Sequence, residues 1–267
     1  MSQVLSAFAD GAVVAKRNLI KIKRVPEVLV FTLLSPIIFV LLFAYVFGGS
    51  IAPTGLNYRE FLIAGIFAQT VVFGATFTGA GLAEDIQKGV IDRFRSLPMS
   101  RSAVLVGRTA SDIFYNVLSI TVMGSTGLLV GWRVRTSLLE ALGGFLLLLL
   151  FAYAFSWIMA YVGLLIPSVE VINNASFIVI FPLTFIANTF VPLENLPTVL
   201  RVFAEWNPVS AVTQAARELF GNTNPAAPPA DVWSLQNPVL YTLLWVAIIL
   251  AIFVPLSVRQ YKRAASR

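Results

Sequence analysis

The chain has 267 residues and a net charge of +6; 58% of the residues are hydrophobic, only 12% are charged, and the mean hydropathy is +0.83. A soluble globular chain carries about 25% charged residues, so this composition excludes a soluble globular protein and indicates a bundle of membrane helices. The sequence has no cysteine and no histidine, which excludes disulfides, thiol nucleophiles, imidazole bases and nearly every zinc or haem site.

The N-terminal segment 1–27 has the pattern of an amphipathic helix. Its apolar positions recur at spacings of three and four residues, namely Leu5, Phe8, Ala12, Ala15, Leu19 and Ile22. Arg17, Lys21 and Arg24 fall on the opposite side, and Pro26 would end the helix. We expect an interfacial helix in the cytoplasmic headgroup layer, because the sequence offers no soluble domain on which it would otherwise pack.

Six apolar runs are long enough to cross a membrane. They cover residues 28–48, 61–82, 113–131, 138–166, 171–191 and 238–258. Together they make up half the chain but hold one charged residue, Glu140, which we place at the outer boundary of its span. The sequence therefore predicts an all-α integral membrane protein with six transmembrane helices in a single domain, 1–267.

The basic residues between these runs predict the orientation. Fourteen of the 19 fall on one side: Lys16, Arg17, Lys21, Lys23, Arg24, Lys88, Arg93, Arg95, Arg101, Arg108, Arg259, Lys262, Arg263 and Arg267. The other side has Arg59, Arg133, Arg135, Arg201 and Arg217. Because basic residues are retained in the cytoplasm, both termini are expected there.

The connection 84–101, between the second and third runs, is the richest in charge. It also carries one apolar stripe, Ile86, Val90, Ile91, Phe94 and Leu97, and Pro98 stops the pattern. A short amphipathic helix here would dock into a groove on a partner, with its charges fixing the register. A solvated cytoplasmic loop, which would be rich in Lys and Arg in any membrane protein, explains the pattern equally well.

The outer connection 192–237 is too apolar to be disordered. We expect two short helices divided at Asn207 and Pro208, the second ending at Gly221, and an open loop over 224–230. Apolar helices outside the spans are expected to dip back into the outer face of the membrane.

Two of the spans present an amide and a ladder of aromatic rings on one face. These residues are Gln69, Phe73 and Phe77 in the second span, and Asn173, Phe177 and Phe181 in the fifth, with Asn174 adjoining. Rings supply contact area and amides supply oriented hydrogen bonds, which suits a large, partly apolar molecule. Lipid-facing rings and helix-to-helix amide contacts are the plainer interpretation, and the pattern alone favours it.

The remaining charges indicate that energy enters from another subunit. Arg108 and Asp112, four residues apart at the start of the third span, are expected to pair. No Asp, Glu, Lys or Arg lies at the centre of a span, which argues against proton or sodium coupling. No lysine stands in the Gly-Lys-Ser/Thr context of a phosphate-binding loop, so a nucleotide site is not expected in this chain.

Two separated motifs carry a family resemblance. Residues 88–101 (KGVIDRFRSLPMSR), followed by Gly107, Arg108 and Asp112, resemble the signature of type-2 ABC exporter permeases, particularly the daunorubicin-resistance group. Residues 190–193 (FVPL), Leu196-Pro197 and 207–217 (NPVSAVTQAAR) resemble that family's segment before the last span.

This resemblance implies partners and sites. Such permeases pair with a second copy or a close relative, and two separate ATP-binding subunits, which hold ATP and Mg, dock on the N-terminal helix and the helix between spans two and three. The candidate coupling residues are then Glu84, Asp85, Lys88, Gly89, Asp92, Arg93 and Arg95. The second and fifth spans frame the family's substrate path, so Gln69, Phe73, Phe77, Asn173, Asn174, Phe177 and Phe181 become a candidate substrate surface. Many relatives begin the coupling helix with an Arg-Glu or Glu-Arg pair where this chain has Glu84 and Asp85, so the charge on its ATPase is expected to differ.

The expected function is that of a permease subunit in the bacterial plasma membrane. It would move an amphipathic drug-like or lipid-like substrate out of the cytoplasm or inner leaflet, with no cofactor, enzymatic step or nucleic acid of its own. An exporter of a lipid-linked glycan or cell-envelope lipid is the nearest alternative. An integral membrane transferase would need paired acidic clusters for a metal-diphosphate, and Glu84-Asp85 is the one adjacent pair. A passive channel is weaker still, since nothing resembles a filter.

Overall fold

The computed structural model describes residues 13–15, 17, 20, 26–47, 58–95, 103–166, 168–193, 196–223 and 231–264. These residues form helices joined by short connections, with no strand among them. In chain order the elements are α2 (Pro26–Leu42), the π-helix η1 (Phe43–Phe47), α3 (Tyr58–Gly74), α4 (Thr76–Gln87), α5 (Val90–Arg95), α6 (Ala103–Val130), α7 (Leu138–Leu165), α8 (Val169–Phe185), α9 (Thr198–Glu205), α10 (Pro208–Phe220), α11 (Trp233–Gln236) and α12 (Pro238–Ala264). The predicted interfacial helix 1–27 lies largely outside the described residues.

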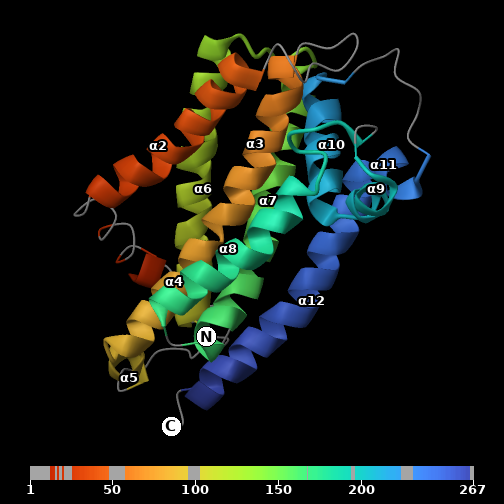
Figure 1. Ribbon diagram of the computed structural model, residues 1–267. Coiled ribbons are helices and arrows are strands. Elements are labelled where there is room, and N and C mark those ends of the chain that lie inside the picture. Colours follow the sequence, from red (N-terminus) through yellow and green to blue (C-terminus); the bar gives the residue numbers. More distant parts are fainter. Residues whose placement is uncertain are drawn as a thin grey trace.

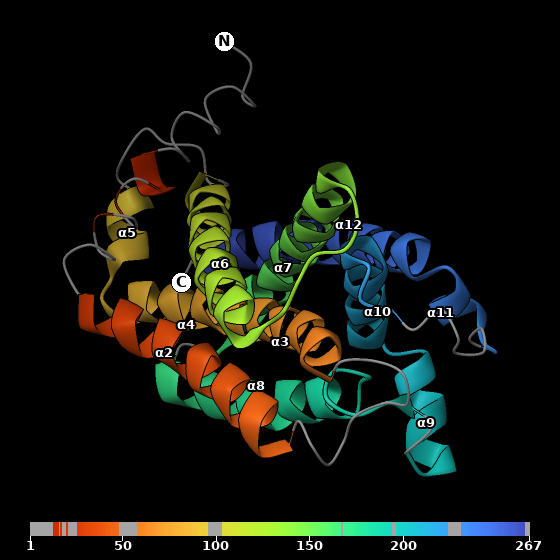
Figure 2. The same cartoon turned by 90° about the horizontal axis from the view of Figure 1, so that it is seen from above.

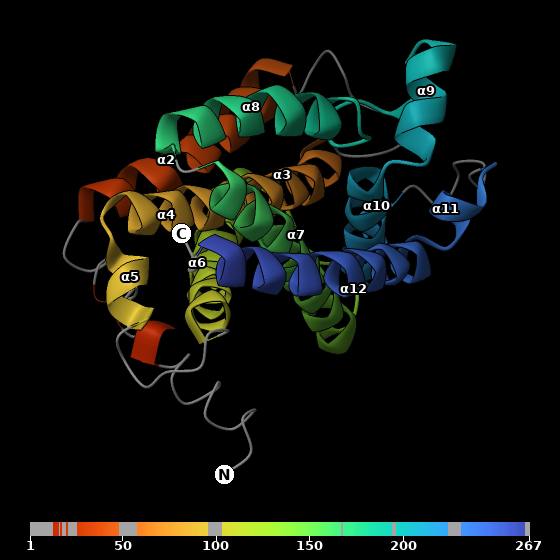
Figure 3. The same ribbon diagram turned by 90° about the horizontal axis from the view of Figure 1, so that it is seen from below.

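The long helices form a bundle around α7, which packs against α3, α4, α6, α10 and α12. Viewed along the bundle, α2 and α8 lie on one side of α3 and α4, and α12 lies beyond α7 on the opposite side (Figures 2 and 3). Figure 1 shows α5 and the C-terminal end of α12 at one end of the bundle, and α9 and α11 toward the other. The described basic residues of α5 and of the last turns of α12 therefore lie at the same end of the molecule.

Four helical stretches of the described chain are long and apolar enough to cross a membrane: Tyr58–Gln87, Val104–Val130, Leu138–Leu165 and Pro238–Arg263. They fall on the second, third, fourth and sixth predicted spans. The first and fifth predicted spans fall on the apolar helices α2 and α8, each of 17 residues. An all-helical protein with membrane-spanning character is confirmed, and the count of six spans stays a prediction.

The second predicted span is not one uninterrupted helix. It turns at Ala75, where Ala75 N–H bonds to the Val72 carbonyl and Thr78 N–H to the Ala75 carbonyl, at 3.3 and 3.0 Å. These bonds join residues three apart, the tighter pattern of a 3₁₀ turn. The helix then continues past the predicted end at residue 82 to Gln87, and it stops before Gly89, whose φ of +64° is the left-handed conformation that glycine adopts without strain.

The third helix begins at Ala103, ahead of the predicted start at residue 113. It accommodates two charged residues because they are paired: Arg108 Nε lies 3.8 Å from Asp112 Oδ1, as the spacing predicted. Asp112 also accepts a hydrogen bond from the Thr78 hydroxyl of α4. The predicted start at residue 113 is therefore too late, because the prediction required a run without charged residues.

The fifth helix ends at Phe185, earlier than the predicted end at residue 191. Residues 186–190 turn back instead, because side chains from α10 and its cap bind carbonyls in the last turn of α8 and in the segment that follows it. Asn207 donates to the Leu183 carbonyl at 2.7 Å, and Arg217 donates to the Asn188 carbonyl at 2.7 Å. Backbone groups released from the helix thus find partners in α10.

The described part of the outer connection contains three helices: α9, α10 and the four-residue α11. The first two are divided at Asn207, as predicted, and α10 begins at Pro208. Asn207 caps α10 by accepting from Val209 N–H at 2.8 Å, and Gly221 ends α10 with a φ of +70°. The helix α10 is buried against α3, α7 and α12, and its Phe220 ring contacts Phe67, Trp132 and Phe145. α10 is therefore part of the bundle core.

Candidate functional site

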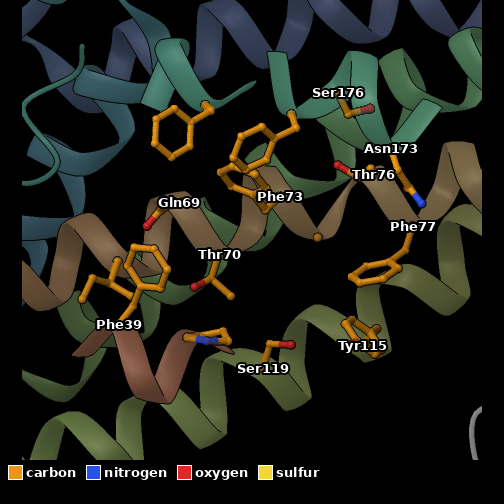
Figure 4. A pocket seen from close by; sticks show the side chains of 15 residues that line it. Phe39, Gln69, Thr70, Phe73, Thr76, Phe77, Tyr115, Ser119, Asn173 and Ser176 are labelled. Carbon is orange, nitrogen blue, oxygen red and sulfur yellow. The ribbon is translucent and has the colours of Figure 1, made fainter. Parts of the chain in front are cut away.

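A cavity of about 490 Å³ opens among α2, α3, α4, α6 and α8 (Figure 4). The described residues that line it are Pro36, Phe39, Ile66, Gln69, Thr70, Phe73, Gly74, Thr76, Phe77, Tyr115, Ser119, Asn173, Ser176, Phe177 and Phe181. Cavities of this size accommodate a drug-sized ligand. The turn between α3 and α4 forms one wall, because Gly74, Thr76 and Phe77 all face the space.

The cavity gathers six of the seven residues predicted as the substrate surface: Gln69, Phe73, Phe77, Asn173, Phe177 and Phe181. They come from the consecutive helices α3 and α4 and from α8, which lies far from them in the sequence. Asn174 is not among the lining residues and is exposed. One residue along an α-helix is a rotation of about 100°, which carries Asn174 off the face that Asn173 occupies.

The walls combine aromatic rings with neutral polar groups. The Phe73 and Phe177 rings lie 6.4 Å apart between centroids, and the Phe177 and Phe181 rings are stacked at 4.9 Å. Across the cavity the Phe77 ring lies 5.4 Å from Tyr115. None of the described lining residues is charged. Such a site can hold an aromatic, partly polar molecule by ring contacts and a few oriented hydrogen bonds.

Nine of the described wall residues were not predicted as substrate surface, and they include Phe39 of α2, Tyr115 and Ser119 of α6, and Ser176 of α8. A signal existed for three of these four. Tyr115 and Ser119 are four residues apart, and Ser176 is three residues after Asn173, so each adds a hydroxyl to one helix face. Phe39 is one apolar residue among many in its helix, and only the tertiary structure brings it to the cavity.

The predicted coupling residues divide among three elements. Glu84 and Asp85 lie at the end of α4, Lys88 and Gly89 form the turn that follows, and Asp92, Arg93 and Arg95 lie on α5. The residue pattern predicts one continuous segment for all seven. The structure instead places the first two on the helix whose other end lines the cavity.

The acidic pair at the end of α4 is engaged within the chain. Asp85 is buried, with 8% of the residue exposed, and its Oδ2 lies 2.9 Å from Arg17 Nη2 of the N-terminal segment. Glu84 Oε1 accepts from Lys88 Nζ at 2.5 Å, and this hydrogen bond raises the pKa of Lys88 above its usual value. Asp85 therefore ties the N-terminal segment to α4, and the side chains of Lys88 and Arg93 are exposed.

Residues 11–220 match the ABC-2 type transporter family. The chain is 35% identical over 246 residues to the daunorubicin resistance ABC transporter permease protein DrrB1 of Streptomyces coeruleorubidus, with 92% of this chain and 83% of that protein covered. It is 24% identical over 196 residues to the probable doxorubicin resistance ABC transporter permease protein DrrC of Mycobacterium tuberculosis, covering 73% of this chain and 67% of the relative. The putative transport permease ycf38 of Cyanophora paradoxa is 26% identical over 221 residues, at 79% and 74% coverage.

Proposed function

Because the chain belongs to the ABC-2 type transporter family, we propose that it is the permease subunit of an ATP-driven exporter of amphipathic, drug-like compounds. It works in the bacterial plasma membrane with both termini in the cytoplasm. The cavity among α2, α3, α4, α6 and α8 receives the compound from the cytoplasm or the inner leaflet.

The chemistry of the cavity is the observation that carries this proposal. Its described walls are uncharged and present several phenyl rings beside the amides of Gln69 and Asn173. A permanently charged ion would lose its hydration there without gaining a counter-charge, whereas a polycyclic compound with a few polar substituents would bury its apolar surface and keep its hydrogen bonds. The names of two relatives, which refer to daunorubicin and doxorubicin resistance, agree with such a cargo.

ATP hydrolysis takes place in a separate ATP-binding subunit, which supplies the ATP and Mg site. The sequence of this permease has no phosphate-binding loop. The subunit docks at the end of the bundle where α5 lies, and exposed Lys88 and Arg93 support a charged contact there. A second copy of the permease completes the transport path.

The proposal is tested with the permease co-purified with its ATP-binding subunit and reconstituted into inside-out vesicles. We expect ATP-dependent accumulation of daunorubicin in the vesicles, and stimulation of ATP hydrolysis by daunorubicin. If daunorubicin neither changes the rate of ATP hydrolysis nor accumulates in the vesicles, the result would contradict a drug cargo. Accumulation of a lipid-linked glycan under the same conditions would support the alternative exporter instead.

The coupling contact is tested by reversing two charges on α5, Arg93→Glu with Arg95→Glu. The double variant should fold and bind daunorubicin but lose most of the stimulation, because its charges would repel the surface that the arginines attract. The matched control is Arg259→Glu with Lys262→Glu, which reverses two exposed charges near the end of α12. Normal stimulation in the α5 variant would show that α5 is not the contact.

A further inference from the structure

The helix α4 joins the cavity to the coupling segment, by which we mean residues 84–95 with the candidate coupling residues. The first residues of α4, Thr76 and Phe77, line the cavity, and its last turn carries Glu84 and Asp85. α4 has only twelve residues and is set off from α3 by the tight turn at Ala75. A short stretch of 3₁₀ geometry inside a helical segment is typical of a hinge. If α4 moves as a rigid unit, its two ends move together.

Two polar residues of α6 hold the cavity end of α4. Arg108 Nη2 donates to the Phe77 carbonyl at 2.6 Å, and Arg108 Nε lies 3.8 Å from Asp112 Oδ1. Asp112 in turn accepts from the hydroxyl of Thr78. The side chains of Arg108 and Asp112 are only 14% and 11% exposed. Hydrogen bonds that involve charged groups are stronger than neutral ones, and more so away from water.

Glycines let α4 approach its neighbours closely. A Cβ on Gly81 would overlap the Arg108 guanidinium, so the guanidinium lies directly over the helix backbone. A Cβ on Gly163 of α7 would overlap the Gly79 backbone, so α7 packs equally closely on another face of α4. Packed interfaces of this kind resist sliding, because no side chain can adjust to fill a gap.

We infer that Arg108, together with Asp112, is a positioning residue that clamps α4 to α6, so that α4 transmits a displacement of the coupling segment to the cavity wall at Gly74, Thr76 and Phe77. The inference rests on the proposed function, which supplies the displacement. The clamp lies just beyond the turn at Ala75. Motion of α4 is therefore taken up at that turn, where it changes the shape of the cavity.

The clamp itself is tested on the permease alone, by distance measurements between two spin labels. The chain has no cysteine, so Gln87→Cys on α4 and Val117→Cys on α6, both at exposed positions, give one pair of labels within each permease chain. Diluting the labelled chain with unlabelled permease isolates this pair. We expect a narrow distance distribution with Arg108 present and a broad one after Arg108→Gln or Gly81→Ala. Gly124→Ala is the control, because its Cβ would meet no atom closer than 3.8 Å. Unchanged distributions in both test variants would overturn the clamp.

Its role in transport is tested with the ATP-binding subunit present. Arg108→Gln should lower the maximal stimulation of ATP hydrolysis by daunorubicin at least about fivefold, the lower end of typical coupling between sites. The daunorubicin concentration for half-maximal stimulation should change less than the maximal stimulation, because Arg108 itself does not line the cavity. A shifted half-maximal concentration with intact maximal stimulation, or no change in either, would overturn the positioning role. If the unaltered permease exports no drug, the proposed function fails, while the distance measurement still decides whether the clamp exists.

Discussion

Arg217 of α10 is a buried cation held by backbone carbonyls. Only 2% of the residue is exposed, and its guanidinium carbon lies 3.5 Å from the centroid of the Phe61 ring. It donates to the carbonyls of Phe61, Asn188 and Thr189 at 3.1, 2.7 and 3.3 Å. Burial lowers the pKa of Arg217 to about 9, which still leaves it protonated at neutral pH. It thus joins α3, α10 and the turn after α8.

Replacing this arginine should destabilise the fold. Arg217→Met keeps the volume but leaves two turn carbonyls without their donor, so we expect a loss of about 3 kcal/mol in the free energy of unfolding. Thermal unfolding in detergent would measure it. Arg201→Gln, on the partly exposed Arg201–Glu205 pair of α9, is the control and should change stability little. Equal stability of the two variants would contradict the bridging role of Arg217.

Single rings in the cavity should set drug affinity. Phe177 contacts both Phe73 and Phe181, so Phe177→Ala should weaken daunorubicin binding about tenfold through lost aromatic contacts. Quenching of daunorubicin fluorescence by the purified permease would report the affinity. Phe114→Ala is the matched control, because Phe114 of α6 is 53% exposed and lies outside the cavity. Equal daunorubicin affinity in the two variants would contradict the proposal that the drug binds in the cavity.

Among the elements, α7 shows how a central helix is placed. Ser137 and Glu140 form a capping box at its start: Ser137 accepts from Glu140 N–H, and Glu140 accepts from Ser137 N–H. Glu140 is exposed there, at the end of its span as predicted. Further along α7, a Cβ on Gly144 would overlap the Phe220 ring of α10, and a Cβ on Gly163 would overlap the Gly79 backbone of α4. The two glycines therefore let α10 and α4 pack closely on α7.

These close contacts predict a position-dependent effect of adding a single methyl group. Gly163→Ala would push its Cβ into the Gly79 backbone of α4, and we expect a loss of about 2 kcal/mol in the free energy of unfolding. Gly143→Ala, on the same helix, meets its nearest atom at 4.0 Å and should be neutral or slightly stabilising. Thermal unfolding of the two variants compares them directly, and equal shifts would argue against close packing of α4 on α7.

The elements also show why several helix ends escaped sequence analysis. A membrane helix is predicted as a run free of charge, yet α6 extends through Arg108 and Asp112 because each finds a partner on α4 or its own helix. Conversely, α8 ends inside an apolar run because Asn207 and Arg217 bind the carbonyls of the turn. In both cases a long-range hydrogen bond overrides the local pattern.

At the scale of the whole molecule, the distribution of basic residues predicts which end faces the cytoplasm. The end with α5 and the C-terminal part of α12 should lie inside, and α9 outside. Since the chain has no cysteine, single cysteines report this directly. A membrane-impermeant thiol reagent added to intact cells should label a Val199→Cys variant on α9 and not an Arg259→Cys variant on α12. If only the Arg259→Cys variant is labelled, the orientation is the opposite of the predicted one.

The class of protein and the residue types that line the cavity follow from the sequence alone. Segregation of charge from apolar runs requires a membrane bundle, because a bilayer excludes charges whatever the packing. Helical periodicity placed an amide and rings on one face of each of two spans, and six of those residues share the cavity. These are consequences of local geometry and composition.

How these faces combine depends on the packing of the helices against one another. The residue pattern favoured lipid-facing rings, and only the packed helices show that α2 and α6 add further walls around these rings. The clamp of Arg108 on the Phe77 carbonyl likewise joins residues 31 positions apart, and the carbonyl partners of Arg217 are up to 156 positions away. Backbone carbonyls leave no trace in a residue pattern, so contacts made to them become visible only when the helices are packed together.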